Sequence, residues 1–255
     1  MRRIVRDLAL CLRVRPLRES SKLVTFFTKS DGRLVCIAKG ARRPKSRFGA
    51  ALEPFAVSEI TLYRHQQKTI YPVSEATLIS SHPGIVAEPA RFLAAEQVGE
   101  FLLRTSSDHD PNEQLWRLAL TYLGEIERAD AALPVLVTSF LLKAASFLGF
   151  RPELRNCLVC RCPLPAASNP ARWRFDVRRG GAICPDCGTA PDAPVVSVEQ
   201  LTGLADLLYS PAAGLAGGSA GADDAASAER LGLVRAFLAH HIDRLLLNSF
   251  NWREL

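Results

Sequence analysis

Four cysteines in the second half of the chain form two pairs with the spacing of a metal site. Cys157 and Cys160 make one C-x-x-C pair, Cys184 and Cys187 make the other, and 23 residues separate the pairs. A C-x-x-C turn directs two thiolates to one point, so two such turns build a tetrahedral four-sulfur site that suits Zn2+. A closed site of this kind leaves no position for water or substrate. The pattern therefore predicts a structural zinc ion and argues against a zinc enzyme.

A further cysteine beside the first pair leaves one ligand assignment open. Cys162 follows Cys160 by two residues and can replace it as a ligand. Cys11 and Cys36 lie in strand-like runs, and we interpret them as small core residues. Seven cysteines, an odd number that includes two C-x-x-C pairs, fit reduced thiols and a bound metal better than a disulfide framework.

Basic residues concentrate in the N-terminal third. Residues 1–80 contain 16 Lys and Arg against 6 Asp and Glu, whereas the remaining residues contain 16 against 20. This asymmetry suggests a module that binds a polyanion, although a solvated basic surface has the same composition. The candidate DNA-binding residues are Arg13, Arg15, Arg33, Lys39, Arg42, Arg43, Lys45, Arg47, Arg64 and Lys68.

Alternating apolar and polar residues predict five strands near the N-terminus, and turn signals such as Ser30-Asp31-Gly32 separate some of them. The segment 39–47 is a loop with five cations and no acid. Five short strands without helices favour a small barrel, with the OB-fold as the leading candidate, and such folds commonly bind single-stranded nucleic acid. The predicted strands are residues 8–14, 22–28, 33–38, 52–63 and 68–76.

From residue 82 onward the apolar spacing becomes helical. Pro89, the Asp110-Pro111 pair and Pro134 each begin a predicted helix, and a capping box at Ser197 begins another. A last helix is expected from Glu229 to Leu247. We therefore predict an α+β multidomain chain. Its parts are an OB-fold in residues 1–80 and an all-helical domain in residues 81–255, with a zinc element at 154–192 and a low-complexity surface insertion at 211–228.

Several classes of protein do not fit the chain. No apolar run approaches the length of a membrane span, and the first residues lack an apolar signal core, so we expect the cytoplasm. The phosphate-binding, nucleophile-elbow and zinc-protease motifs are absent from the sequence, so we expect no catalytic residues. Asp108, His109 and Asp110 can ligate a metal, but the capping pattern after them favours a helix-capping loop.

Four segments, taken in order, resemble the bacterial RecO family of recombination mediators. Residues 7–33 look like the first strands of that family, and residues 39–55 resemble its signature basic loop and the strand after it. Residues 140–160 resemble its central helix running into the zinc pair, and residues 174–187 match the second half of the site. Arg161 stands at a position where glycine is frequent in that family.

The resemblance implies an N-terminal OB-fold, a helical second domain and, in many members, an embedded four-cysteine zinc element. It also implies binding of single- and double-stranded DNA, annealing of complementary strands, and association with the nucleoid in the RecF pathway of repair. The implied protein partners are RecR, which helps to load RecA, and the acidic tail of single-strand-binding protein. For that tail the candidate residues are Lys143 and Arg151, near Phe140 and Phe147. The alternative function is a zinc-ribbon DNA-binding regulator without annealing activity.

Overall fold

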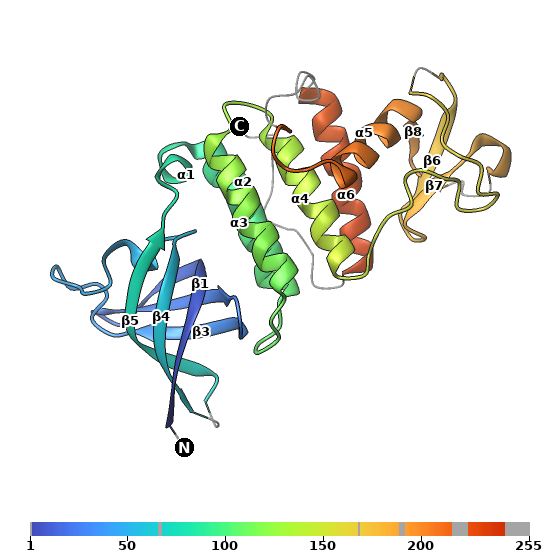
Figure 1. The fold of residues 1–255 in the computed structure, drawn as a ribbon. Helices are drawn as coiled ribbons and strands as arrows, with labels where there is room; N and C mark the ends of the chain where they lie inside the picture. The colour runs from blue at the N-terminus through green and yellow to red at the C-terminus, as the bar shows by residue number, and fades with distance from the viewer. Residues whose placement is uncertain (1, 66–67, 168, 189–191, 216–223, 243–255) are drawn as a thin grey trace. The chain divides into compact units, whose positions relative to one another are not determined.

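The structure, a computed structural model, consists of a β-barrel followed by helices and a small second sheet (Figure 1). It describes residues 2–65, 68–167, 169–188, 192–215 and 224–242.

The N-terminal strands form a closed barrel in the order β1-β2-β3-β5-β4. β3 and β5 are parallel, whereas the other neighbouring strands are antiparallel. The predicted OB-fold is thereby confirmed. The strands are β1 (Arg2–Leu17), β2 (Ser21–Thr28), β3 (Gly32–Ala38), β4 (Val57–His65) and β5 (Ile70–Ser80).

The barrel closes because β1 is long enough to pair on both sides. Its N-terminal half pairs with β4 and its C-terminal half pairs with β2, and a register shift between Cys11 and Arg13 bends the strand. Side chains in β3 alternate strictly between buried and half-buried, so one face fills the barrel. The interior is apolar and includes Phe26, Leu34, Cys36 and Ile60.

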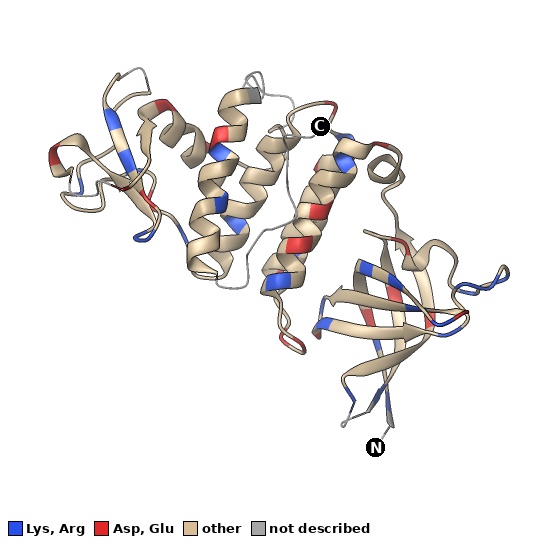
Figure 2. Ribbon diagram, turned by 180° about the vertical axis from the view of Figure 1, so that it is seen from behind, with Lys and Arg blue, Asp and Glu red and all other residues tan. Residues whose placement is uncertain are grey.

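The segment between β3 and β4 is not a simple loop. The predicted strand start at Leu52 is wrong, because Gly49–Leu52 forms a 3-10 turn (η1) and β4 begins only at Val57. Ser58 donates its hydroxyl to the carbonyl of Ala51, which holds this turn against the barrel wall. The preceding residues, 39–47, project from the barrel and gather several of its Lys and Arg residues (Figure 2).

Three helices follow the barrel: α1 (Pro83–Ala87), α2 (Pro89–Thr105) and α3 (Glu113–Arg128). Two aromatic pairs join them to the barrel, since the rings of Phe55 and Phe92 lie 5.6 Å apart and those of Phe27 and Trp116 lie 6.1 Å apart. Such pairs add to the stabilisation that comes from burial alone.

The predicted start of α3 at Asp110 is wrong. Asn112 accepts a hydrogen bond from the backbone N–H of Leu115 through Oδ1, so Asn112 caps the helix and Asp110 lies before it. The acid three residues after Asp110, Glu113, is instead the first residue of the helix.

The remaining elements form helices around α4 and a three-stranded sheet of order β7-β6-β8. The predicted capping box at Ser197 is confirmed, because Ser197 and Gln200 exchange side-chain and backbone hydrogen bonds. The elements are α4 (Leu133–Phe147), β6 (Arg172–Asp176), β7 (Gly181–Ile183), a 3-10 turn η2 (Pro185–Cys187), β8 (Val195–Ser197), α5 (Val198–Tyr209) and α6 (Asp224–His241).

The predicted surface insertion at 211–228 overlaps a helix. α6 begins at Asp224, so the last five residues of that segment are helical, while residues 216–223 lie outside the described part of the chain. Residues 243–247 of the predicted final helix, which include Leu245, also lie outside it.

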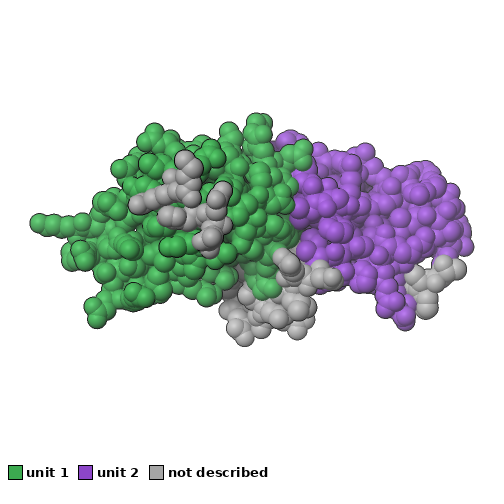
Figure 3. Space-filling model, turned by 90° about the horizontal axis from the view of Figure 1, so that it is seen from below, with its two compact units in different colours: residues 1–128 green, residues 129–255 purple. Residues whose placement is uncertain are grey.

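The chain divides into two compact units, residues 1–128 and residues 129–255 (Figure 3). The first unit thus contains the barrel together with α1 to α3. A domain boundary after residue 80, at the end of β5, stays a prediction. Within the described residues, no helix combines the length and the apolar character needed to cross a membrane.

We predict that Gly32→Ala strongly destabilises the first unit. Gly32 has φ +66°, and a Cβ there would lie 2.5 Å from the carbonyl oxygen of Asp110. Left-handed backbone strain and this overlap together should lower the free energy of unfolding by about 3 kcal/mol. Urea unfolding followed by circular dichroism measures the change.

Gly49→Ala is the matched control for this prediction. Gly49 also has a positive φ, +48°, but nothing lies within 4 Å of the position of its Cβ. Its substitution should therefore cost only about 1 kcal/mol. Equal losses for the two variants would contradict the importance of the close approach of Asp110 to Gly32.

Candidate nucleic-acid interface and metal centre

An open groove of about 900 Å³ lies at one end of the barrel. The turn between β1 and β2 forms one side, and the first residues of the loop after β3 form the other. These two segments meet because Lys22, at the start of β2, pairs with Ala38, at the end of β3. Apolar side chains, three cations and one acid line the groove. The apolar ones are Leu17, Leu23, Ile37 and Ile70, the cations are Arg18, Lys39 and Arg43, and the acid is Glu19.

Arg42 holds the two sides of this groove together. Its guanidinium donates a hydrogen bond to the carbonyl of Arg18 at 3.0 Å, and its backbone N–H donates to the carbonyl of Ser20 at 3.0 Å. These bonds tie the cationic loop to the β1–β2 turn, where Arg18 has φ 54°. Arg42 therefore positions the groove as well as adding charge to it.

Most of the predicted DNA-binding residues are exposed near this end of the barrel. The structure places Lys39, Arg42, Arg43, Lys45 and Arg47 together on the single loop 39–47, all of them exposed. Arg47 also lies 5.2 Å from the ring centroid of Phe48, which is buried in the barrel core.

Three further predicted cations, Arg13, Arg15 and Lys68, are also exposed. Arg13 and Arg15 lie on the C-terminal part of β1, which pairs with β2. Lys68 comes two residues before Ile70, which lines the groove. Burial raises the pKa of Glu96 in α2, and the charge of Arg13 opposes that rise. Arg13 therefore has a carboxylate nearby, so part of its charge is already balanced.

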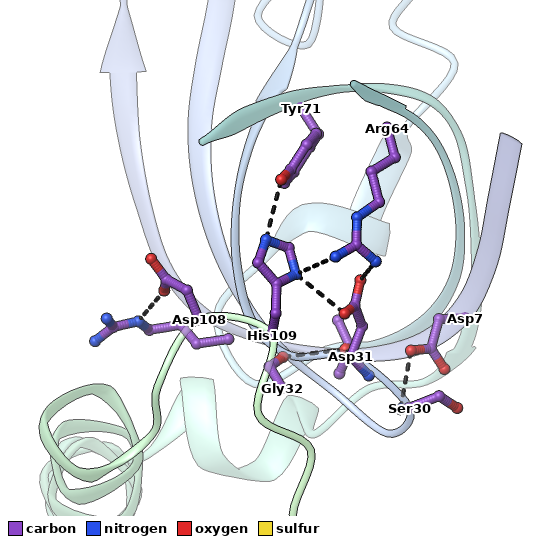
Figure 4. A network of polar contacts seen from close by, with 10 residues as sticks. Asp7, Ser30, Asp31, Gly32, Arg64, Tyr71, Asp108 and His109 are labelled. Atoms are coloured by element: carbon purple, nitrogen blue, oxygen red, sulfur yellow. Dashed lines mark hydrogen bonds and ion pairs between the residues drawn. The ribbon is translucent and has the colours of Figure 1, made fainter. Parts of the chain in front are cut away.

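The last two predicted cations, Arg33 and Arg64, form ion pairs within the first unit. Arg33 Nε lies 2.8 Å from Asp108 Oδ1, and Arg33 also donates to the carbonyl of Leu103 at 2.8 Å. Arg64 lies 2.8 Å from Asp31 Oδ2 (Figure 4). Because Arg33 is the second residue of the seven-residue strand whose end leads to Lys39, it lies at the opposite end of β3 from the cationic loop.

His109 completes this network from the turn between α2 and α3 (Figure 4). Its Nδ1 lies 2.8 Å from Arg64 and 3.0 Å from Asp31, and its Nε2 lies 3.0 Å from the hydroxyl of Tyr71. The backbone at Asp108 also bridges to Gly32 and Arg33. The segment 108–110 thus attaches the α2–α3 turn to the barrel, and the side chains of Asp108 and His109 are engaged in protein contacts.

The second unit contains a cluster of cysteine thiols. The Sγ atoms of Cys157, Cys160, Cys162 and Cys184 all lie within 4.8 Å of one another, and those of Cys160 and Cys184 are 3.6 Å apart. Tetrahedral Zn–S bonds of about 2.3 Å place neighbouring sulfurs about 3.8 Å apart, so the spacing suits one ion. This group of four can hold a metal ion, and it includes Cys162, the spare residue of the sequence pattern.

The fourth predicted ligand, Cys187, is not one of these four thiols; it lies at the end of η2, three residues after Cys184. The structure therefore brings together three of the predicted ligands, Cys157, Cys160 and Cys184, and adds Cys162, the spare residue of the sequence pattern.

The pKa values of the thiols differ from one another. Burial by itself raises the pKa of Cys157, but hydrogen bonds from the backbone N–H groups of Cys184, Cys160 and Val159 lower that pKa to about 6. Hydrogen bonds to Cys160 raise the pKa of Cys162 and of Cys187 to about 12 each. A cation replaces protons at such a cluster, because metal binding requires thiolates.

The two cysteines of the barrel are different. Burial raises the pKa of the Cys36 thiol to about 12 and shifts that of Cys11 even further upward. Both are fully buried in the core, as their positions in strands predict. They are poor candidates for metal binding or modification, because the thiolate is the reactive form.

The predicted partner-binding residues lie at the end of α4 and just beyond it. Lys143 donates a hydrogen bond to the carbonyl of Ser210, and its partial burial lowers its pKa. Arg151 lies 4.9 Å from the ring centroid of Tyr209, and Arg155 lies 3.8 Å from the same centroid. Phe140 is buried, whereas Phe147 is 42% exposed, so only the latter can contact another molecule.

Three residues of these surfaces were missed by sequence reasoning. Arg18 lines the groove, but its approach to Lys39 depends on strand register and carries no local signal. Arg155 and Tyr209 are far apart in sequence and meet only through packing of the second unit. Arg155, a cation between the central helix and Cys157, is the one sequence feature from which its pairing with Tyr209 could have been suspected.

Comparisons with known proteins agree over almost the whole chain. The family described as "Recombination protein O N terminal" matches residues 1–82, and "Recombination protein O C terminal" matches residues 87–249. A relative from Anaeromyxobacter sp. (strain Fw109-5), named DNA repair protein RecO, is 34% identical over 239 residues, which cover 93% of this chain and 91% of the relative.

Two further relatives bear the same name. The protein from Streptomyces griseus subsp. griseus is 31% identical over 251 residues, covering 94% of this chain and 95% of the relative. The protein from Thermoanaerobacter sp. (strain X514) is 32% identical over 187 residues, covering 72% of this chain and 71% of the relative.

We predict that the reduced protein binds one metal ion per chain and that Cys184→Ser abolishes the binding. Cys184 is buried and its thiol contacts Cys160, so a serine there removes a ligand from the middle of the cluster. Cobalt titration followed by absorption measures the stoichiometry. Cys36→Ser, a substitution in the barrel core, is the control and should bind as the parent does; loss of metal in both variants would contradict the assignment.

Proposed function

The chain belongs to the RecO family of DNA repair proteins, and we propose that it acts as a non-enzymatic mediator of recombinational repair in the RecF pathway. In this proposal it binds single- and double-stranded DNA, anneals complementary strands, and works with RecR and single-strand-binding protein to help load RecA. It does so in the cytoplasm, in association with the nucleoid.

The observation that supports this proposal is the cationic groove at the end of the barrel. Lys39, Arg43 and Arg18 rim a floor of aliphatic side chains. Cations neutralise phosphates and release counterions, while an apolar floor accepts the faces of unstacked bases. The arrangement suits a single strand because both halves of a nucleotide find a complementary surface.

The loop beyond the groove extends this surface. Lys45 and Arg47 are exposed on it, and Arg13 and Arg15 lie on the neighbouring part of β1. We assign these residues to phosphate contacts without base preference. Arg33 and Arg64 are assigned a structural role first, because their guanidinium groups already pair with Asp108 and Asp31.

The thiol cluster is assigned to a structural Zn2+ ion. Four thiolates at these separations satisfy a tetrahedral ion completely, and zinc prefers such all-sulfur sites. The ion, when bound, links the turn at Cys157–Cys162 to the turn at Cys184–Cys187. Its contribution is to the folding of this element, and we assign it no part in catalysis.

We assign the tail of single-strand-binding protein to the surface formed by Arg151, Arg155, Tyr209 and Phe147. The two guanidinium groups offer charge to an acidic peptide, and the partly exposed rings offer an apolar contact to its last residue. Lys143 supports this surface from α4 through its bond to Ser210.

Strand annealing tests the proposed function as a whole. The full chain should accelerate the pairing of complementary oligonucleotides that are coated with single-strand-binding protein. A zinc-ribbon regulator would instead bind one duplex sequence and leave the coated strands unpaired, so that result would reject the mediator assignment.

We predict that Lys39→Ala combined with Arg43→Ala weakens binding of a fluorescent single-stranded oligonucleotide. Loss of two phosphate contacts should reduce the slope of log affinity against log salt concentration by about 1.4. The control is Arg117→Ala combined with Arg128→Ala, which removes the same charge from the exposed side of α3. Equal effects of the two pairs would mean that only net charge matters, against the groove.

We also predict that Arg151→Ala combined with Arg155→Ala lowers the affinity for the acidic tail peptide by about tenfold or more, because two charged contacts are lost. Calorimetry with the synthetic peptide measures the change. Arg178→Ala combined with Arg179→Ala, at an exposed turn of the same unit, is the control of equal charge. An unchanged affinity in the first variant would remove this surface from the proposal.

A further inference from the structure

The first half of β1 has one side without a neighbouring strand. β1 pairs with β2 only from Ala9 onward, because β2 ends at Thr28, the residue that faces Ala9. In the described part of the chain, residues 2–8 pair only with β4. The strand therefore leaves an open edge along its N-terminal part (Figure 1).

The open edge presents the backbone groups of alternate residues. The carbonyl of Leu8 accepts a hydrogen bond from the N–H of Lys29 at 2.9 Å, so the backbone groups of Leu8 point away from β4. In an antiparallel strand the N–H and C=O of one residue point to the same side, and that side alternates along the strand. The backbone groups of Ile4 and Arg6 therefore point to the open side, whereas those of Val5 point to β4.

Asp7 marks the point at which the edge opens. Its carboxylate accepts hydrogen bonds from the N–H of Ser30 at 2.9 Å and from the N–H of Leu8 at 2.8 Å. Beyond it, no backbone hydrogen bond within the described residues joins Ile4 or Arg6 to a neighbour on this side. A strand edge with unpaired N–H and C=O groups is a template for one further strand.

The side chains along this edge are apolar and cationic. Ile4 is 64% exposed, and Arg3 and Arg6 are exposed on either side of it. Arg6 lies 3.7 Å from Glu59 of β4, but both side chains of this pair are exposed, so water weakens their attraction. The edge thus offers positive charge together with one apolar contact.

This charge selects the kind of strand that can pair here. Residues 2–6 contain three arginines and no acid, so two copies of this chain joined through the same edge would bring their arginines together. Like charges across a pair of strands are destabilising, whereas opposite charges are stabilising. A phosphate chain can neutralise arginines, but it has no donor for the carbonyls of the edge. An acidic polypeptide strand satisfies both the charges and the backbone groups.

We propose that residues 2–6 of β1 are a docking edge for an extended acidic segment of a partner protein, which adds to the barrel as a strand. Its backbone pairs with Ile4 and Arg6, its acidic side chains lie beside Arg3 and Arg6, and an apolar side chain covers Ile4. None of the residues that line the groove belongs to this edge, so the inference is independent of the DNA-binding proposal.

Fluorescence anisotropy with a labelled octapeptide of alternating Glu and Val tests the docking on the full chain. The peptide should bind, and a version with every backbone amide N-methylated should bind about tenfold more weakly or worse, because it keeps the charge and loses the strand pairing. Failure of the first peptide to bind, or equal binding of the two, would overturn the proposal.

Ile4→Pro provides a matched test in the protein. A proline there keeps the ladder with β4 and removes one donor from the open edge, so the variant should unfold near the urea concentration of the parent and bind the peptide about tenfold more weakly. The control is Val5→Pro, which removes an N–H that faces β4 and should destabilise the barrel. Equal destabilisation by the two prolines, or a stable Ile4→Pro chain with unchanged peptide affinity, would contradict the proposal.

Amide hydrogen exchange on the unsubstituted chain, resolved by NMR, gives a test that needs no variant. The Glu-Val peptide should slow exchange at Ile4 and Arg6 and leave Val5, whose N–H already faces β4, nearly unchanged. Protection of Ile4 and Arg6 by a single-stranded oligonucleotide, with none from the peptide, would assign the edge to nucleic acid and overturn the proposal.

Discussion

The pairing of β1 with two different strands is the constraint on which the proposed DNA-binding surface depends. β1 reaches β4 through its first half and β2 through its second, which closes the barrel and fixes the register of β2 against β3. That register brings the turn at Arg18 next to the loop that begins at Lys39. Without closure the same cations would lie on separate segments. The affinity for a phosphate chain would then be a property of net charge and not of a groove.

Cations in this chain have two different uses, and the structure separates them. Arg33 and Arg64 lie among acids, with Asp108 and Asp31 within ion-pairing distance, and they attach the α2–α3 turn to the barrel. The cations of the loop 39–47 are exposed on a segment without acids. The proposed polyanion surface therefore centres on the end of β3 that leads into this loop. In the second unit, the thiol cluster brings the turn at Cys157–Cys162 close to Cys184.

Local patterns were enough to predict much of this fold from the sequence. Strand alternation predicted the barrel, and the C-x-x-C pairs predicted three of the four clustered thiols. The errors arose where distant contacts override local signals. Asp110 resembles a helix cap, but its backbone lies against Gly32, so Asn112 caps the helix instead. Leu52 looks like a strand residue, yet it ends a 3-10 turn. The approach of Arg18 to Lys39 depends on strand register, and the position of Cys162 in the cluster depends on one left-handed residue, Arg161. Neither can be predicted from residue spacing.

The central claim is that DNA lies in the groove at the end of the barrel. Amide hydrogen exchange on the full chain, with and without a saturating single-stranded oligonucleotide, tests this claim most directly. The account predicts slower exchange in residues 18–21 and 39–47 when DNA is bound, with α4 unchanged. Protection that appears only in α4 to α6, or only around Arg33 and His109, with the groove segments unaffected, would contradict it.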